Sequence, residues 1–490
     1  MWYRGRSLFA VMVLTAIAAS IVTYTVVKLP DWALQPSAVE AGASSSGSAE
    51  GWSEEELGKL NKALDLIEER YMTDTDRSQL LDGAVQGMVE SLRDPYSVYK
   101  SSEEAQKFSD ALQGAFTGIG AELKIENGTV VVDSAIKGSP AERAGLQPRD
   151  VLLSVNGQSL HGVTLSEAVS KIRGPKGTKA KLKISRAGAA EPLELEMVRD
   201  RIDLETVHAD LGQDGIGRLS INQFTYDTSA EVADRVRAME EQGLKALIID
   251  VRDNPGGILQ SVLEVSEQFI EKNKPILVNE YRDGRHKTEF AVNGLDRLKP
   301  YPIIVLINKG SASAAEILAG ALKQSANAVL VGDTSYGKGT VQVSYDKELG
   351  DGSLVKLTVY KWLLPDGTWI HQKGIDPDLA VSQPDYFLAS RLPRDHVLQY
   401  DVTGEPVKNL QNILEGIGFP ADRKDGYFSK GTEAAVQQFQ LSEQLPVDGQ
   451  VNAATADRLE EKLYVNLQNP EYDTQWQAAV KKARELMPAS

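Results

Sequence analysis

Two short segments of the chain carry residue types that suit acyl-transfer chemistry. The first, residues 308–317 (NKGSASAAEI), follows an apolar run and leads into an alanine-rich stretch, so Ser313 is expected at a strand-to-helix turn. The partial positive charge at a helix N-terminus favours an oxyanion that develops beside such a serine. The pattern also fits an ordinary serine N-cap, and it is not the G-x-S-x-G elbow of α/β-hydrolases. This segment alone leaves both interpretations open.

The second segment, residues 332–342 (GDTSYGKGTVQ), supplies a lysine. It narrowly misses the phosphate-binding pattern G-x-x-x-x-G-K-[ST], because Gly339 stands where a metal-binding hydroxyl is required. Lys338 is instead a candidate general base for Ser313, provided that burial lowers its pKa and keeps the amine neutral. Gln342 follows four residues later, and its amide could orient that amine through a hydrogen bond. Together the two segments predict a serine nucleophile activated by a lysine.

Composition removes several other kinds of chemistry. The 490 residues include no cysteine and five histidines, and no two histidines have the spacing of a zinc-protease motif. We therefore expect neither a metal nor another cofactor. The net charge of −16, from 53 Lys and Arg against 69 Asp and Glu, argues against nucleic acid as a partner. The length suggests about three domains.

The N-terminus indicates a location. Residues 7–27 contain no charged side chain and follow Arg4 and Arg6, so this run is long enough to cross a bilayer with a cytoplasmic N-terminus. Residues 1–30 are predicted to be a signal anchor; the alternative is a cleaved signal peptide. In either case the rest of the chain acts outside the cytoplasm. Residues 31–51, rich in Ser, Gly and Ala, predict a flexible linker.

The remaining chain changes its periodicity from segment to segment. Helical spacing of apolar residues comes first, short β-runs follow, and apolar strands then alternate with helices, which is typical of an α/β core. The last helix is expected to pack on the body of the protein or on a second subunit. The predicted parts are a helical region at 52–114, a β-rich domain at 115–198, the α/β core at 199–385, a small all-α domain at 404–464 and a C-terminal helix at 465–490.

The β-rich part resembles a PDZ domain. Residues 117–120 (TGIG) stand where that family binds a terminal carboxylate, and residues 139–146 (SPAERAGL) are the most recognisable stretch. The resemblance implies that an extended peptide adds to a strand edge opposite a helix over residues 165–172. Arg173 follows this helix; we hypothesise that it couples peptide binding to activation, the alternative being a solvated loop charge. The implied peptide-binding residues are Gly118, Ile119, Gly120, Ala121, Leu165, Val169 and Arg173.

Residues 404–464 resemble the helical peptidoglycan-binding domain of cell-wall enzymes. They contain an internal near-repeat, in which Asp425-Gly426 and Thr432 return at the same offset as Asp448-Gly449 and Thr455. The resemblance implies peptidoglycan as a partner. A module that docks to a protein is the alternative, because a fold does not fix its function.

The motifs in combination resemble the carboxy-terminal processing peptidases, also called tail-specific proteases. The resemblance rests on residues 308–317 and 336–342, together with LDGA at 81–84, DPYS at 94–97, DVRDNPGG at 250–257 and GIDPD at 374–378. It implies a ClpP/crotonase-like α/β protease core. Ser313 would be the nucleophile, Lys338 the base and Gln342 the orienting residue, with the backbone amides of Gly256 and Ala314 as the oxyanion hole.

The function that this resemblance implies is a serine endopeptidase at the extracytoplasmic face of a bacterial membrane. Its PDZ domain would recognise polypeptide substrates by their accessible C-termini, and a homodimer is left open. A catalytically silent PDZ and peptidoglycan-binding scaffold is the alternative. That alternative requires a lesion at Ser313 or Lys338, and the sequence has none.

Overall fold

The computed structural model describes residues 51–126, 128–136, 138–186, 189 and 191–487. The apolar segment 7–27 and nearly all of the predicted linker lie outside these ranges. Within them, no helix is both long enough and apolar enough to cross a membrane. The chain divides into two compact units, the first ending at Leu81 and the second starting at Asp82.

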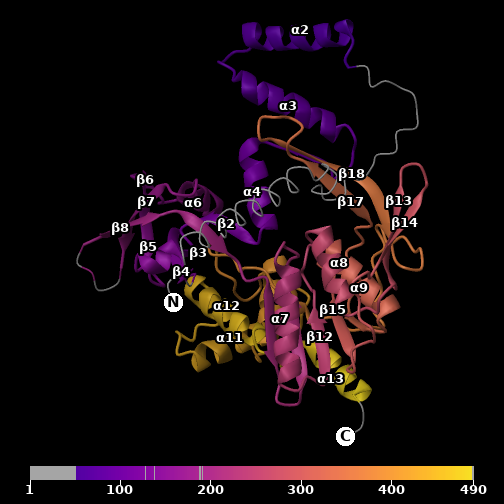
Figure 1. Cartoon of the computed structure of the whole chain (residues 1–490). Coiled ribbons are helices and arrows are strands. Elements are labelled where there is room, and N and C mark those ends of the chain that lie inside the picture. Colours follow the sequence, from indigo (N-terminus) through magenta and orange to yellow (C-terminus); the bar gives the residue numbers. More distant parts are fainter. Residues whose placement is uncertain (1–50, 127, 137, 187–188, 190, 488–490) are drawn as a thin grey trace, which may run out of the picture. The chain divides into compact units, whose positions relative to one another are not determined.

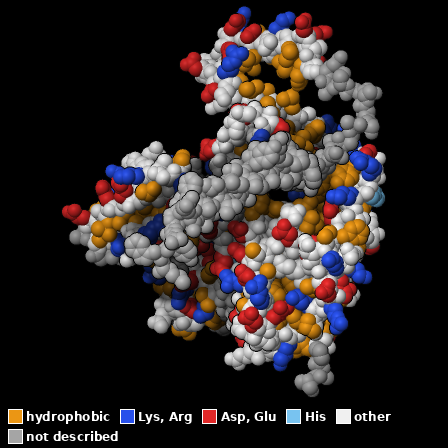
Figure 2. Space-filling model, in the orientation of Figure 1, with side chains coloured by type: hydrophobic (Ala, Val, Ile, Leu, Met, Phe, Trp, Pro, Cys, Tyr) orange, Lys and Arg blue, Asp and Glu red, His pale blue; other side chains and the backbone are white. Residues whose placement is uncertain are grey.

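The first unit contains the amphipathic helix that the sequence predicts. Helix α2 (Glu54–Arg70) begins at a capping box, in which the Ser53 amide donates to Glu56 and the Glu56 amide donates back to the Ser53 hydroxyl. No side chain of α2 is buried, and its apolar stripe, which includes Leu57 and Leu60, is exposed (Figure 2). The homodimer stays a prediction. The next helix, α3 (Arg77–Glu90), runs across the boundary between the units.

The β-rich part forms a six-stranded sheet whose edge strands are β3 and β8. Its strand order is β3-β4-β5-β7-β8, with β6 paired to β5, so β3 lies at the edge and contacts helix α6. A separate pair, β2 with β9, joins the entry and exit of this part. The bounds are β2 Ala115–Gly118, β3 Ala121–Glu126, β4 Thr129–Ala135, α5 Pro140–Arg143, β5 Val151–Val155, β6 Gln158–Ser159, α6 Leu165–Ile172, β7 Lys179–Ser185, β8 Leu193–Val198 and β9 Asp200–Asp203.

The α/β core is built on a second six-stranded sheet, in the order β10-β11-β12-β15-β16-β19. Its neighbouring central strands β12 and β15 are labelled in Figure 1. Every pairing from β11 to β19 is parallel. The bounds are β10 Val207–Leu211, β11 Ile216–Ile221, α7 Thr228–Glu241, β12 Ala246–Asp250, α8 Leu259–Glu267, β15 Ile303–Ile307, α9 Ala314–Ser325, β16 Val329–Gly332, β19 Leu379–Ala380 and α13 Thr474–Leu486.

Both faces of this sheet are covered, which explains why its central strands are apolar throughout. Leu247 and Ile249 of β12 face a core shared with α7, α8 and α9. Ala246 and Ile248 point the other way, into a core that includes Ala479 of α13. The last helix therefore packs on the body of the protein, one of the two arrangements expected from the sequence.

A third sheet, absent from the sequence predictions, flanks this core. The long strand β18 (Leu354–Leu363) pairs with three strands that are far apart in the chain. These are β1 (Val98–Lys100), β13 (Pro275–Tyr281) and β17 (Thr340–Tyr345); β14 (His286–Phe290) adds to β13. Helix α4 (Ser102–Leu112) follows β1.

The small C-terminal domain has three helices, α10 (Glu405–Gly416), α11 (Lys430–Ser442) and α12 (Ala453–Leu467). The near-repeat has a structural counterpart. In the first copy the Gly426 amide donates to Gln411, whose amide donates to Thr432. In the second copy Gln440 makes the equivalent bonds with Gly449 and Thr455. One buried glutamine thus links each Asp-Gly turn to the helix that follows it.

Candidate active site

Three segments that carry predicted catalytic or oxyanion-hole residues meet at the carboxyl ends of three neighbouring parallel strands. Strands β12, β15 and β16 lie side by side, and a loop leaves each of them at the same edge. In open α/β sheets this edge is where ligands bind. The Ala312 amide donates to the Asn254 carbonyl at 2.9 Å, and the Tyr336 amide donates to the Ser311 carbonyl at 3.0 Å. The two loops therefore flank and hold the serine turn between them.

Ser313 ends that turn in a strained conformation. Its φ of 55° lies in the left-handed region that non-glycine residues rarely adopt, which is the kind of strain found at functional sites. Ser311, two residues earlier, is fully buried and donates to the Val251 carbonyl at 2.7 Å. Ser313 is only half-buried, and its hydroxyl makes no such bond to a strand. Of the two serines, Ser311 is therefore suited to a structural role and Ser313 to chemistry.

A buried carboxylate, which the sequence did not single out, joins the serine turn to the lysine loop. Glu316, in the first turn of α9, has an exposed fraction of 0%. One oxygen, Oε2, accepts from the amides of Ser313 (2.9 Å) and Lys338 (2.8 Å). The other, Oε1, accepts from the Ser335 hydroxyl and the Gly337 amide, both at 2.6 Å. A single side chain thus fixes the backbone of both predicted catalytic residues.

The two predicted oxyanion-hole residues lie against each other. A Cβ built on Gly256 (φ 104°) would stand 2.9 Å from Ser313 Cβ and 3.0 Å from the Ala314 nitrogen, so only glycine fits there. Ala314 is the first residue of α9, and its amide has no acceptor among the described residues. The Gly256 amide donates to Asn254 Oδ1 at 2.8 Å in this structure. The Ala314 amide is therefore available to a developing oxyanion, and the Gly256 amide would first have to leave Asn254.

Lys338 is held in an environment that disfavours its charged form. Burial, and secondarily the positive charge of Lys356, lower the pKa of Lys338 to about 8, while Asp94 and Glu316 oppose the shift. The amine lies 4.9 Å from the centre of the Tyr96 ring. The backbone carbonyl of Lys338 accepts from the indole of the buried Trp362 at 2.8 Å. A lysine with a pKa near neutrality is suited to general-base catalysis.

The predicted dyad and its orienting residue are not hydrogen-bonded to one another. Among the described residues, the Lys338 amine makes no hydrogen bond to the Ser313 hydroxyl. The amine lies instead over the Tyr96 ring. The Gln342 amide donates to the hydroxyls of Thr340 and Thr358, each at 3.1 Å, rather than to Lys338. The structure therefore brings the three residues into one region with the amine turned toward Tyr96.

Tyr96 and its motif reach this site through strand pairing. Residues 94–97 precede β1, which pairs with β18 of the third sheet. The Ser97 hydroxyl donates to Asp94 at 2.6 Å and accepts from the Thr358 amide at 3.0 Å. Burial, followed by its hydrogen bond with Tyr336, raises the pKa of Tyr96 to about 12. Residues 94–97 are part of the family resemblance, but the sequence alone predicts no role for them. In the structure this motif supplies the Tyr96 ring, which lies beside the Lys338 amine.

The residues predicted to bind a peptide surround the free edge of β3. Gly120 (φ 76°) has no room for a side chain, since an added Cβ would stand 2.3 Å from that of Ser139. Leu165 and Val169 lie on α6, which contacts β3, the strand that begins at Ala121. Arg173 is the C-cap residue of α6, where its backbone amide donates to the Val169 carbonyl. Its guanidinium lies 5.1 Å from the centre of the Phe116 ring, on the strand that carries Gly118. The side chain of Ile119 is buried in the domain core, so only its backbone would be available to a peptide.

Among the described residues there is no group of three or more His, Asp or Glu side chains that could hold a metal ion.

Comparisons with known proteins agree with this architecture. Peptidase family S41 matches residues 215–381, a PDZ domain matches 131–186, a peptidoglycan binding domain matches 403–459, and the activating protease CtpB N-terminal domain matches 16–104. The carboxy-terminal processing protease CtpB of Bacillus subtilis (strain 168) is 43% identical over 90% of this chain and 92% of its own length. The chain belongs to the carboxy-terminal processing protease family. CtpA of the same organism is 39% identical over 99% of this chain and 100% of its own length.

The environment of Lys338 predicts the pH dependence of this processing protease. If Lys338 is the base, its amine must be neutral to accept a proton, so activity should rise with pH through about 8, the pKa of Lys338. Replacing Lys356 with methionine removes a neighbouring positive charge, so the pKa of Lys338 should rise and the acidic limb of kcat/KM should move to higher pH. Lys356→Arg, which keeps the charge, should leave the limb in place. An unmoved limb in both variants would show that Lys356 does not influence the base.

Proposed function

We propose that this member of the family is an extracytoplasmic serine endopeptidase that uses Ser313 as nucleophile and Lys338 as base. The observation that carries the proposal is the pairing of a strained, half-buried serine at a helix N-terminus with a lysine whose pKa is lowered to about 8. In this mechanism Lys338 accepts the Ser313 proton as the oxygen attacks a peptide carbonyl. The Ala314 amide, with that of Gly256, stabilises the tetrahedral oxyanion. Lys338 then protonates the leaving amine, and water hydrolyses the acyl-enzyme.

Catalysis requires the Lys338 amine to turn from the Tyr96 ring toward Ser313. Gln342 would orient it there in place of its present bonds to Thr340 and Thr358. The α/β core would follow the ClpP/crotonase-like architecture that the resemblance implies.

We propose that substrates are recognised by their C-termini at the edge of β3. The free edge, the adjacent α6 and the turn at Gly120 support binding by strand addition. The test uses an unfolded protein with an apolar C-terminus and the same protein with an amidated C-terminus. The free carboxylate form should be cleaved at least several-fold faster, and Arg173→Ala should abolish that difference if Arg173 couples binding to activation. Equal cleavage of the two forms would contradict recognition of the C-terminus.

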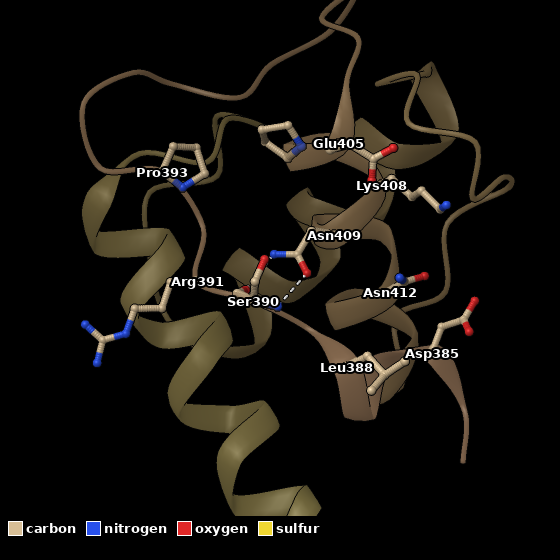
Figure 3. A pocket seen from close by; sticks show the side chains of 10 residues that line it. Asp385, Leu388, Ser390, Arg391, Pro393, Glu405, Lys408, Asn409 and Asn412 are labelled. Atoms are coloured by element: carbon tan, nitrogen blue, oxygen red, sulfur yellow. Dashed lines mark hydrogen bonds between the residues drawn. The ribbon is translucent and has the colours of Figure 1, made fainter. Parts of the chain in front are cut away.

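The C-terminal domain supports a location at the cell wall. A hollow of about 500 Å³ lies beside α10 (Figure 3). Asn409 holds its wall together, since Asn409 Oδ1 accepts from the Ser390 amide at 2.9 Å and its Nδ2 donates to the Ser390 carbonyl at 2.6 Å. Charged and amide groups around this hollow, including Lys408 and Asn412, suit a polar polymer such as peptidoglycan. Co-sedimentation of the purified protein with insoluble peptidoglycan tests this partner. If the protein stays in the supernatant, a protein ligand for the C-terminal domain is favoured instead.

A further inference from the structure

The first turn of the last helix is bonded to the loop that carries Gly256. Arg252 begins this loop, and its guanidinium pairs with Asp250 at 2.7 Å and with Asp473, the N-cap of α13, at 2.8 Å. Burial opposes the charge of Arg252, but the two carboxylates outweigh it and raise the pKa of Arg252. The side chain is 11% exposed. The ion pair is thus largely removed from water and fixes where the loop leaves β12.

The same turn is also bonded to the loop that carries Lys338. Gln475, with an exposed fraction of 0%, donates through Nε2 to Asp333 Oδ2 and to the Val381 carbonyl, both at 2.8 Å. Its Oε1 accepts from Arg252 at 3.1 Å. Asp333 is the first residue after β16, five positions before Lys338. One buried amide therefore bridges the two loops on either side of the serine turn.

We propose that Gln475 and Asp473 are positioning residues for the reaction, holding the Lys338 loop and the Gly256 loop in fixed relation to Ser313. This inference rests on the proposed function of Ser313 and Lys338. Helix α13 follows directly after the small C-terminal domain, so it gives that domain a covalent and hydrogen-bonded route to both loops. The helix is more than a cover for the sheet, because its buried polar residues are placed where the catalytic loops begin.

The sharpest variant is Gln475→Glu, which keeps the acceptor toward Arg252 and replaces the donor toward Asp333 with a repelling carboxylate. Loosening the loop should admit water to Lys338 and raise its pKa, so the acidic limb of kcat/KM should move up by about one pH unit and the rate at pH 7 should fall about tenfold. The titratable groups that face Lys338 are Asp94 and the neutral Tyr96 before β1, Glu316 on α9 and Lys356 on β18. None of these groups belongs to α13, so the variant leaves all of them in place.

Reciprocal substitution distinguishes positioning from bulk stability. In the double variant Gln475→Glu, Asp333→Asn the amide and carboxylate exchange sides, so the bond between the two positions is restored in the opposite direction. The limb should move back toward its wild-type position, while the bond to the Val381 carbonyl stays lost. Gln475→Met, which introduces no charge, should shift the acidic limb in the same direction as Gln475→Glu. If Gln475→Glu does not fold, the pH profile of Gln475→Met tests the positioning role instead. Arg484→Gln on the same helix removes an exposed ion pair with Asp214 and should change nothing.

The pH profile of kcat/KM and the thermal unfolding of each full-length variant are measured side by side on a peptide substrate. A lowered melting temperature with an unmoved limb would reduce Gln475 to a structural residue and overturn the inference, as would unchanged behaviour in every variant. An inactive wild-type protein would instead contradict the proposed function itself.

Discussion

Replacing Ser313 or Lys338 with alanine should lower the rate of peptide cleavage by roughly 10⁴-fold or more, the largest effect expected of any single change in this chain. In the proposed mechanism Ser313 supplies the oxygen that attacks the peptide carbonyl. Loss of Lys338 removes the proposed base, and Glu316 is poorly placed to replace it because its two oxygens are already engaged by four donors. Cleavage of an unfolded protein with an apolar C-terminus, followed by mass spectrometry, measures the loss.

Matched controls separate this chemistry from damage to the fold. Ser311→Ala removes a neighbouring hydroxyl from the same turn, where it bonds to the Val251 carbonyl. It should cost stability of about 1–2 kcal/mol but leave turnover by the folded enzyme largely intact. Lys338→Arg keeps the positive charge but cannot act as a base, and should be as inactive as Lys338→Ala. Equal cleavage by the wild type and by Ser313→Ala would remove Ser313 from the mechanism.

The serine turn was predictable because its signals are local. An apolar strand, Gly310 and an alanine-rich helix are contiguous in the sequence, and the strand is apolar throughout because both faces of its sheet are covered. The same reasoning predicts β12 closely. The alternation of strands and helices also predicts helices over residues 258–271 and 312–324. Helix α8 begins one residue later and ends four residues earlier than expected, and α9 begins two residues later and ends one later.

The third sheet was not predictable in the same way. Strand β18 is half-buried along most of its length and carries polar residues such as Lys356 and Thr358, so it has no continuous apolar run. Its partners come from segments more than 70 residues away, as well as from β17 nearby. The contact between Tyr96 and Lys338 depends on this pairing, and no local pattern could have shown it.

Glu316 was overlooked for a different reason. An acidic residue in the first turn of a helix is an ordinary feature, because its negative charge interacts favourably with the positive end of the helix dipole. Most such residues are solvated. Only the folded chain shows that this one is fully buried beneath two loops. The sequence predicts that Glu316 lies in the first turn of a helix, but it cannot show the four donors that its carboxylate accepts from.

Glu316→Gln is the second prediction with a large effect, because the substitution keeps the shape and reverses half of the hydrogen bonding. A glutamine offers one acceptor oxygen and one NH₂ group, so two of the four donors that now face the carboxylate would instead face a donor. Leaving buried amides unsatisfied typically costs about 1–3 kcal/mol each. We expect the free energy of unfolding to fall by about 2–4 kcal/mol and kcat to fall about 10²-fold or more, because the new NH₂ group would face either the amides of Ser313 and Lys338 or the amide of Gly337, next to Lys338.

Ser335→Ala provides the graded comparison for this carboxylate. It removes only one of the four donors, at Oε1, and spares both amides of the catalytic residues; the Ser335 hydroxyl also accepts from the Ile375 amide, so some stability is lost. Its kcat should fall much less than that of Glu316→Gln, even where the two variants unfold at similar denaturant concentrations. If kcat instead followed stability alone across both variants, Glu316 would be a core residue that happens to lie beneath the site. A loss of kcat out of proportion to stability would mean that this one buried side chain holds the backbones of Ser313 and Lys338 in the relative position that the proposed reaction needs.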